Sequence, residues 1–262
     1  MLDAAADLIR RRYAADRVQH MACRFIERSH PILSRSYGFG RRPIHHPDRR
    51  ATMLNRMLCR ITERGPGLTL DAALERGALL DAATAGGRGV LICTAHQRLA
   101  FAAHGLLRAR GLTPVFVAIP GNVQRGSHWG DRDPLTLVDA ESPDVLFRCA
   151  RHIAQGDIVI AFVDYRIAPD HDGRRAPPVA ISPNAFAWAR TNHVPLLFMA
   201  SRLTSEGRIM LELAQPEARA AGAALARSFA DFLEARTGWR CVVRRRKDAG
   251  VGGSTPIPST RA

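Results

Sequence analysis

The sequence predicts an α/β protein: a mostly parallel central sheet flanked by helices, preceded by a helical N-terminal segment. Two observations lead to this prediction. From about residue 87, short apolar runs bounded by glycine or proline alternate with segments of helical periodicity, which is typical of parallel strands joined by helices. Before that point, apolar residues such as Leu2, Ala6 and Ile9 recur at three- and four-residue spacing, which indicates amphipathic helices.

The elements can be assigned in chain order. Helices are expected on both sides of a loop rich in glycine and proline at 38–50, and a second loop is expected at 120–143. The apolar runs predict strands at 89–95, 113–119, 157–165, 194–203 and 208–214, and the periodic segments predict helices at 98–111, 144–156, 182–192 and 217–236. The last two strands, joined by the residues TSEG, should form an antiparallel hairpin at one edge of the sheet.

These elements divide the chain into three parts. We expect a helical N-terminal segment at 1–85, an α/β domain at 86–240, and a basic tail at 241–262. The tail is rich in glycine, proline and serine after its arginines, so it is predicted to be disordered.

The amino-acid composition limits the kinds of molecule that the protein is expected to bind. The formal charge of +14, carried almost wholly by arginine because Lys247 is the single lysine, favours anionic partners that guanidinium groups can bind in bidentate fashion. Nucleic acid is not expected, since the basic residues are dispersed, aromatic residues are few and no recognition motif occurs. The five cysteines are scattered without CxxC spacing, which argues against disulfides or structural zinc and fits a reducing cytoplasm.

Several common sites can be set aside from the sequence. There is no GxxxxGK[ST] phosphate loop, no GxGxxG after a strand and no GxSxG elbow. The residues DHDG at 170–173 resemble metal ligands, but Arg174 and Arg175 follow them directly, and adjacent cations would repel a metal ion. We therefore expect a solvated turn there and no metal site.

Three predicted strands end in residues that carry catalytic or binding chemistry. His96 follows the first strand, and Asp164 closes the run IVIAFVD. In open α/β sheets catalytic groups cluster beyond the carboxyl ends of the strands, where the next helix presents its N-terminal amides. We take His96 and Asp164 as candidate catalytic residues, although residues at such boundaries also cap helices or face solvent. The candidates for substrate binding are the arginines near the strand ends, Arg98, Arg166 and Arg202.

Four blocks in this order resemble the lysophospholipid acyltransferase superfamily, and most closely its lipid A biosynthesis branch of lauroyl and myristoyl transferases. The blocks lie within about residues 86–240. They are GRGVLICTAHQRLAFAAHGLLRARGLTPVFVA, HIAQGDIVIAFVDYR, ISPNAFAWARTNHVPLLFMASRLTSEGRIMLEL and the closing LARSFADFLEARTGWR. The resemblance implies that His96 acts as general base on a hydroxyl or amine, which then attacks the thioester of acyl-CoA or acyl-carrier protein. It implies no further cofactor.

The sequence departs from that family at one position. The family places an Asp or Glu five residues after the histidine to orient and charge the imidazole, whereas this chain has Phe101 there. Three interpretations remain open. Asp164 supplies the carboxylate from a neighbouring strand end, His96 works alone on a more acidic or more nucleophilic acceptor, or the protein binds acyl chains or lipid without transferring them.

The expected function is therefore acyl transfer in lipid biosynthesis. The acceptor would be a lysophospholipid, a lipid A precursor or a related molecule, with a soluble metabolite as another option. The alternative is a catalytically impaired family member that acts as an acyl- or lipid-binding scaffold. We expect a cytoplasmic protein without a transmembrane helix. Peripheral contact with the anionic inner face of the cell membrane would depend on residues 1–30 and on positive charge.

Overall fold

The computed structural model describes residues 2–36, 47–63, 68–119, 135–166, 178–217, 220 and 222–244. Its helices are α1 (Leu2–Arg12), α2 (Val18–Ser36), α3 (Pro47–Glu63), α4 (Ala78–Thr84), α5 (Ala102–Arg108), α6 (Val145–Ala154), α7 (Asn184–Thr191) and α8 (Gly222–Thr237). Its strands are β1 (Ala72–Glu75), β2 (Val90–Thr94), β3 (Pro114–Ala118), β4 (Thr136–Asp139), β5 (Ile158–Phe162), β6 (Asp164–Arg166), β7 (Val179–Ile181), β8 (Leu196–Leu203), β9 (Ile209–Ala214) and β10 (Cys241–Val243).

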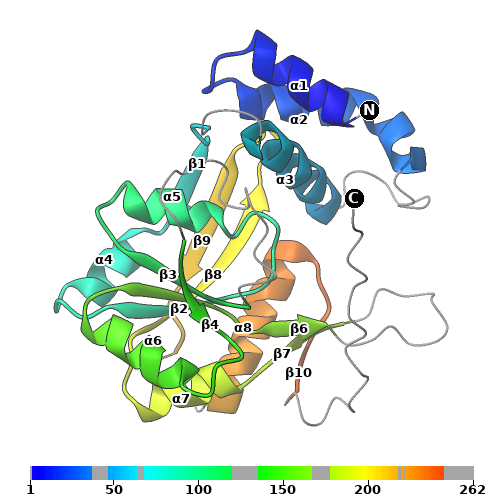
Figure 1. Cartoon of the computed structure of the whole chain (residues 1–262). Helices are drawn as coiled ribbons and strands as arrows, with labels where there is room; N and C mark the ends of the chain where they lie inside the picture. The colour runs from blue at the N-terminus through cyan, green and yellow to red at the C-terminus, as the bar shows by residue number, and fades with distance from the viewer. Residues whose placement is uncertain are drawn as a thin grey trace.

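The centre of the molecule is a seven-stranded sheet with the order β1-β9-β8-β2-β5-β3-β4 (Figure 1). Strands β8 and β9 pair antiparallel, whereas the other neighbouring pairs of this sheet are parallel. Strands β10, β7 and β6 form a second, three-stranded sheet. The predicted α/β class, with a mostly parallel sheet between helices, is therefore confirmed.

The two faces of the large sheet are covered by different helices. Along β2, Val90 and Ile92 belong to a core shared with α1 to α5, whereas Leu91 and Cys93 belong to a core shared with α6, α7 and α8. Every residue of β2 is buried. Because successive side chains of a strand point to opposite faces, a strand covered on both sides must be apolar throughout. This explains the continuous apolar run of β2.

Three short strands lie where the sequence predicted other structure. Strand β1 lies inside the segment expected to be helical at 1–85, β4 lies in the loop expected at 120–143, and β10 lies at the start of the tail expected to be disordered. Each is an edge strand of three or four residues. In β4 only Val138 is buried, so an apolar run is absent and pairing alone defines the strand. The predicted β8–β9 hairpin is confirmed, but β1 covers its outer side.

Two helices begin at other residues than expected. Helix α3 starts at Pro47, inside the predicted loop at 38–50. Proline suits the first turn of a helix because its missing N–H would have no partner there; residues 37–46 lie outside the described part. Helix α5 starts at Ala102 rather than at residue 98. A turn at 95–101 therefore separates it from the end of β2.

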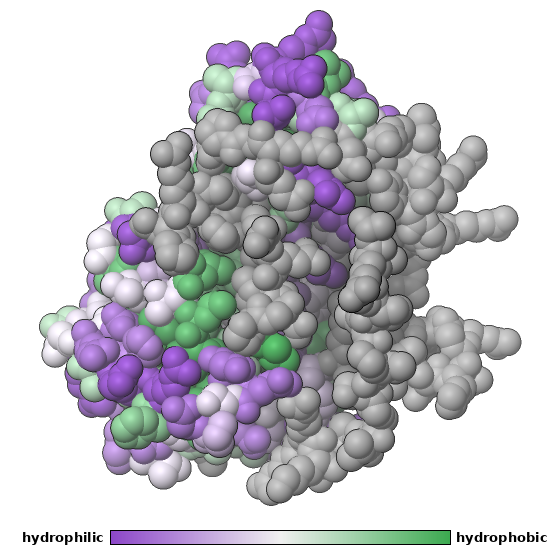
Figure 2. Space-filling view, viewed as in Figure 1, coloured by the Kyte–Doolittle hydropathy of each residue, from purple (hydrophilic) through white to green (hydrophobic). Residues whose placement is uncertain are grey.

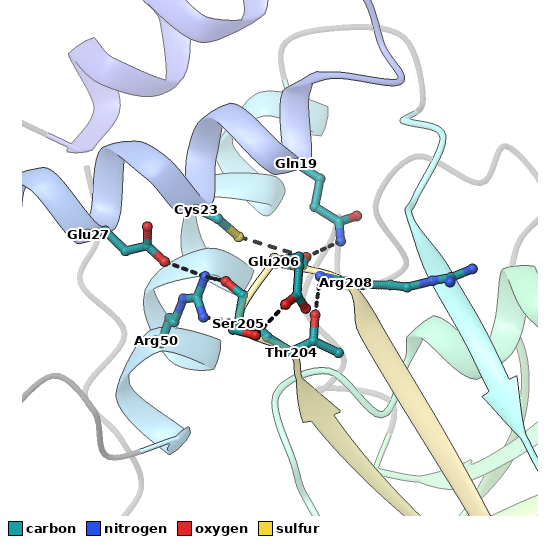
Figure 3. A network of polar contacts seen from close by, with 9 residues as sticks. Gln19, Cys23, Glu27, Arg50, Thr204, Ser205, Glu206 and Arg208 are labelled. Carbon is teal, nitrogen blue, oxygen red and sulfur yellow. Dashed lines mark hydrogen bonds and ion pairs between the residues drawn. The ribbon is translucent and has the colours of Figure 1, made fainter.

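The N-terminal helices hold the turn between β8 and β9 (Figure 3). The buried Gln19 side chain of α2 donates to the carbonyl oxygens of Asp71 and Gly207, at 2.9 and 2.7 Å, and accepts from the Asp71 N–H. The Arg50 guanidinium of α3 donates to the carbonyls of Thr204 and Ser205. These contacts join α2 and α3 to the backbone of the β8–β9 turn and to the backbone of Asp71 before β1. The β8–β9 turn therefore attaches the N-terminal helical segment to the sheet.

On the opposite face of the large sheet, an ion pair makes the stability of the fold depend on pH. The Arg236 guanidinium of α8 donates to both carboxylate oxygens of Glu212, at 2.7 to 3.2 Å, and these hydrogen bonds hold the pKa of Glu212 below its ordinary value. A carboxyl group with a lowered folded-state pKa stabilises the fold above its unfolded-state pKa, and that contribution is lost as pH falls through the folded-state pKa.

We predict that Glu212→Gln lowers the free energy of unfolding by about 1 kcal/mol at neutral pH and flattens its decline below about pH 5. Urea unfolding over a pH series measures both effects. The exposed Glu217 provides the matched control, because Glu217→Gln removes a solvated charge and should leave the curve unchanged. Equal curves for the wild type and Glu212→Gln would contradict the prediction.

Candidate active site

The candidate site lies where the carboxyl ends of adjacent parallel strands meet. Strand β2 pairs with β5 on one side and with β8 on the other. The ladder between β2 and β5 extends one step beyond Phe162, since the Val163 N–H donates to the Thr94 carbonyl at 2.9 Å. The chain segments that leave these two strands therefore remain side by side, and they carry His96 and Asp164.

The imidazole of His96 contacts the carboxylate of Asp164. Nδ1 of His96 lies 2.8 Å from Oδ1 of Asp164, and the same oxygen accepts the backbone N–H of His96 at 2.8 Å. The Asp164 side chain is 8% exposed, whereas the His96 side chain is 62% exposed. A carboxylate at Nδ1 places the proton on that nitrogen, so Nε2 keeps its lone pair for a partner from solvent.

An aromatic ring fixes the plane of the imidazole. Phe162 is the last residue of β5, and Asp164 follows two residues later at the start of β6. Because the pairing with the chain leaving β2 continues through Val163, strand alternation directs both side chains toward the same side. The Phe162 ring stacks on His96 with 4.5 Å between the centroids and 24° between the planes. His96 is thus held by a hydrogen bond at one edge and by a ring against its face.

Phe101 occupies the position where the resembled family has an acid. Its ring packs against Phe116 and Phe162, with centroids at 5.2 and 5.3 Å. It therefore extends the aromatic layer on which the His96 ring stacks. The carboxylate at His96 comes from Asp164, and the phenylalanine supports the ring beneath the imidazole.

Gln97 ties the turn that carries His96 to the next strand. Its buried carboxamide donates to the Ser201 carbonyl at 2.9 Å and accepts the Ser201 N–H at 2.8 Å. Strand β8 is thereby joined to the chain leaving β2, beyond the last paired residues of the ladder. This link holds the turn at 95–101 in place, and His96 with it.

The structure places the three arginines proposed for substrate binding in different surroundings. Arg98 is exposed in the turn after His96. The backbone of Arg166 belongs to β6, and its side chain lies outside the described part. Arg202 pairs with Glu75 of β1 at 2.9 Å. Strand alternation puts Arg202 on the face of Ala200, which packs in the core under α8, whereas Phe162 packs against the other core.

One part of the expected geometry is wrong. His96 was expected beside the N-terminal amides of the following helix, but α5 begins six residues later and has seven residues. The backbone of 95–101 instead forms a turn stabilised by its own hydrogen bonds, such as the Ala100 N–H to the Gln97 carbonyl. The charged partner of the imidazole in this structure is therefore a carboxylate rather than a helix end.

The other reactive groups of the chain are candidate metal ligands and cysteine thiols. The DHDG turn at 170–173 lies outside the described residues, and within the described part no group of three or more potential ligands could hold a metal ion. Burial raises the pKa of the Cys23 and Cys149 thiols to about 11, so they remain protonated and poorly nucleophilic at neutral pH.

Two residues of the site were not identified from the sequence. Phe162 had a signal, because it stands two residues before Asp164 in a strand. Gln97 had a weaker signal, because the sequence shows only a polar residue directly after His96 and the fold alone shows that it is buried.

Figure 2 shows hydrophobic residues gathered between α5 and α6, where β4 lies in Figure 1. Leu106, Leu135 and Leu137 are partly buried apolar residues of this part of the fold.

Comparisons of the chain with protein-family models and with curated proteins find no match. Among the helices that the structure describes, none combines the length and the apolar character needed to cross a bilayer.

Proposed function

We propose that the protein is an acyltransferase in which His96 is the general base and Asp164 its positioning residue. The observation that carries this proposal is the 2.8 Å contact between His96 Nδ1 and Asp164 Oδ1. A buried carboxylate, an exposed imidazole and a supporting ring favour a general-base role for His96. The ordered blocks that resemble acyltransferases, described above, supply the reaction class.

The proposed reaction transfers a fatty acyl group from a thioester to a hydroxyl or amine. Nε2 of His96 accepts the proton of the acceptor as its oxygen or nitrogen forms a bond to the carbonyl carbon. The tetrahedral intermediate then collapses, the carbon–sulfur bond breaks, and the thiolate leaves with the proton from the imidazolium. Asp164 stabilises the imidazolium between these two steps. Acyl-CoA or acyl-carrier protein is the donor, and no other cofactor takes part.

Acceptor and location belong to the same proposal. The acceptor would be a lysophospholipid, a lipid A precursor or a related molecule, reached by a cytoplasmic protein at the inner face of the cell membrane. The charge of +14 supports contact with phosphorylated substrates and anionic lipid. A non-catalytic acyl-binding scaffold is the outcome that the following assay would reveal if transfer is absent.

We expect purified protein to transfer a labelled acyl group to at least one of these acceptors, and His96→Ala to lower kcat by about 10²–10⁴-fold. The matched control is His193→Ala, because His193 is an exposed histidine after α7. The assay offers acyl-CoA and acyl-carrier protein separately with lysophospholipid and lipid A precursor. Transfer that survives in His96→Ala would overturn the general-base role. Retained acyl binding without transfer to any acceptor would overturn the catalytic proposal and indicate a scaffold.

A further inference from the structure

A separate hollow lies among the N-terminal helices. Its cavity volume is about 230 Å³. The residues that line it come from the end of α1, the connection to α2, the start of α2, the end of α3 and the chain after α3. They are Arg10, Arg11, Tyr13, Ala15, Val18, Ile61 and Leu68. None of them belongs to the elements that carry His96 or Asp164.

The lining combines positive charge with an apolar floor. Arg10 and Arg11 stand in the last turn of α1, and Arg11 is exposed. No acidic residue is among the residues that line the hollow. Val18 is 2% exposed and Ile61 is 1% exposed, so the inner wall belongs to the hydrophobic core. A ligand that fits must bring an anion to the rim and apolar atoms to the floor.

We propose that this hollow binds a short amphiphilic anion, a phosphomonoester or a comparable head group that carries a small alkyl chain. Guanidinium groups bind phosphate oxygens through paired, charge-assisted hydrogen bonds. The volume of about 230 Å³ is below the roughly 300–1,000 Å³ of sites that enclose drug-sized ligands. The occupant is therefore a short chain or the end of a longer one. This site does not depend on acyl transfer at His96.

Calorimetric titration of the full chain with hexyl phosphate tests the proposal. Inorganic phosphate presents the head group alone, and hexanol presents the chain alone. We expect hexyl phosphate to bind about tenfold more tightly than either, because only it satisfies both the rim and the floor. Equal affinity for hexanol would show an unspecific apolar hollow and overturn the proposal. Equal affinity for inorganic phosphate would show only surface attraction and overturn it as well.

Neighbouring residues provide a matched set of variants. Arg11→Glu should weaken hexyl phosphate binding about tenfold, whereas Arg12→Glu changes charge equally in the same exposed turn outside the lining and should change it less than about threefold. Ala15→Trp fills the hollow from an exposed position and should abolish binding. Equal losses in Arg11→Glu and Arg12→Glu, or binding retained in Ala15→Trp, would overturn the assignment. Circular dichroism confirms that each variant is folded.

The anionic head group has two sources, a free amphiphile or a bilayer lipid. Phosphatidylcholine vesicles with and without phosphatidic acid separate them. Sedimentation with phosphatidic acid vesicles that Ala15→Trp prevents would assign the site to a bilayer lipid. Binding of monomeric hexyl phosphate without vesicle binding would assign it to a soluble amphiphile. Both outcomes support the same chemistry, and binding of neither probe overturns it.

Discussion

Asp164→Asn is expected to lower kcat for the proposed acyl transfer by about 10²–10⁴-fold while changing KM by less than about threefold. The carboxylate accepts hydrogen bonds from Nδ1–H and from the backbone N–H of His96. A neutral amide cannot stabilise the imidazolium, and its NH2 group can force the wrong tautomer. The substitution therefore weakens the stabilisation of the transition state and leaves substrate binding nearly unchanged.

Steady-state kinetics separate a positioning role from a structural one, because kcat and KM are measured independently. Asp164→Glu should restore part of the rate. Equal losses in kcat and in affinity, without rescue by Asp164→Glu, would show that Asp164 only maintains the fold.

A second histidine–aspartate pair serves as the matched control. His152 Nδ1 lies 2.7 Å from Asp157 Oδ2, between the end of α6 and the start of β5 and so at the opposite edge of the sheet. Asp157→Asn breaks a comparable contact away from the proposed chemistry. We expect it to lower stability and to leave kcat unchanged. A comparable loss of kcat in both variants would indicate a general effect of breaking such pairs.

Phe101 offers a further arm of this experiment. If an acid at that position were able to replace Asp164, Phe101→Asp would restore transfer in the Asp164→Asn background. We expect no restoration, because Phe101 packs against Phe116 and Phe162, and a partly buried carboxylate among these rings would have no polar partner. Recovery of the rate would show that the position used by the resembled family is functional here.

Gly89→Ala is expected to lower the free energy of unfolding by about 3 kcal/mol. A Cβ atom at Gly89 would lie 1.9 Å from the carbonyl oxygen of Asp157 and 2.9 Å from its carbonyl carbon and nitrogen. These are backbone atoms, so no side-chain rotation can relieve the collision. The start of β2 would have to move away from β5 in the middle of the sheet.

Urea unfolding measures this loss, and a nearby glycine gives the control. A Cβ at Gly86 meets nothing within 4 Å, so Gly86→Ala should change stability by less than about 1 kcal/mol. The Gly89 N–H donates to the Ile153 carbonyl at 2.7 Å, which ties the end of α6 to the same region. Similar midpoints for Gly86→Ala and Gly89→Ala would show that β2 and β5 approach less closely than described.

The sequence by itself determined the central strands and the residues that leave their ends. Strands β2, β5 and β8 are covered by helices on both faces, and burial on both faces demands an unbroken apolar run. Such a run is visible without knowledge of its neighbours. The positions of His96 and Asp164 follow from the same property, because the first polar residue after a buried strand marks where that strand leaves the core.

Only the tertiary structure decided which of these ends meet. His96 and Asp164 are 68 residues apart, and their contact depends on β2 and β5 being neighbours in the sheet, which local periodicity does not encode. Strand order likewise places Arg202 beside Glu75 and brings Gln97 within hydrogen-bond distance of the Ser201 backbone. The edge strands β1, β4 and β10 were also decided only by the tertiary structure. Their few residues bury little surface, so pairing with a distant partner defines them rather than a pattern of their own.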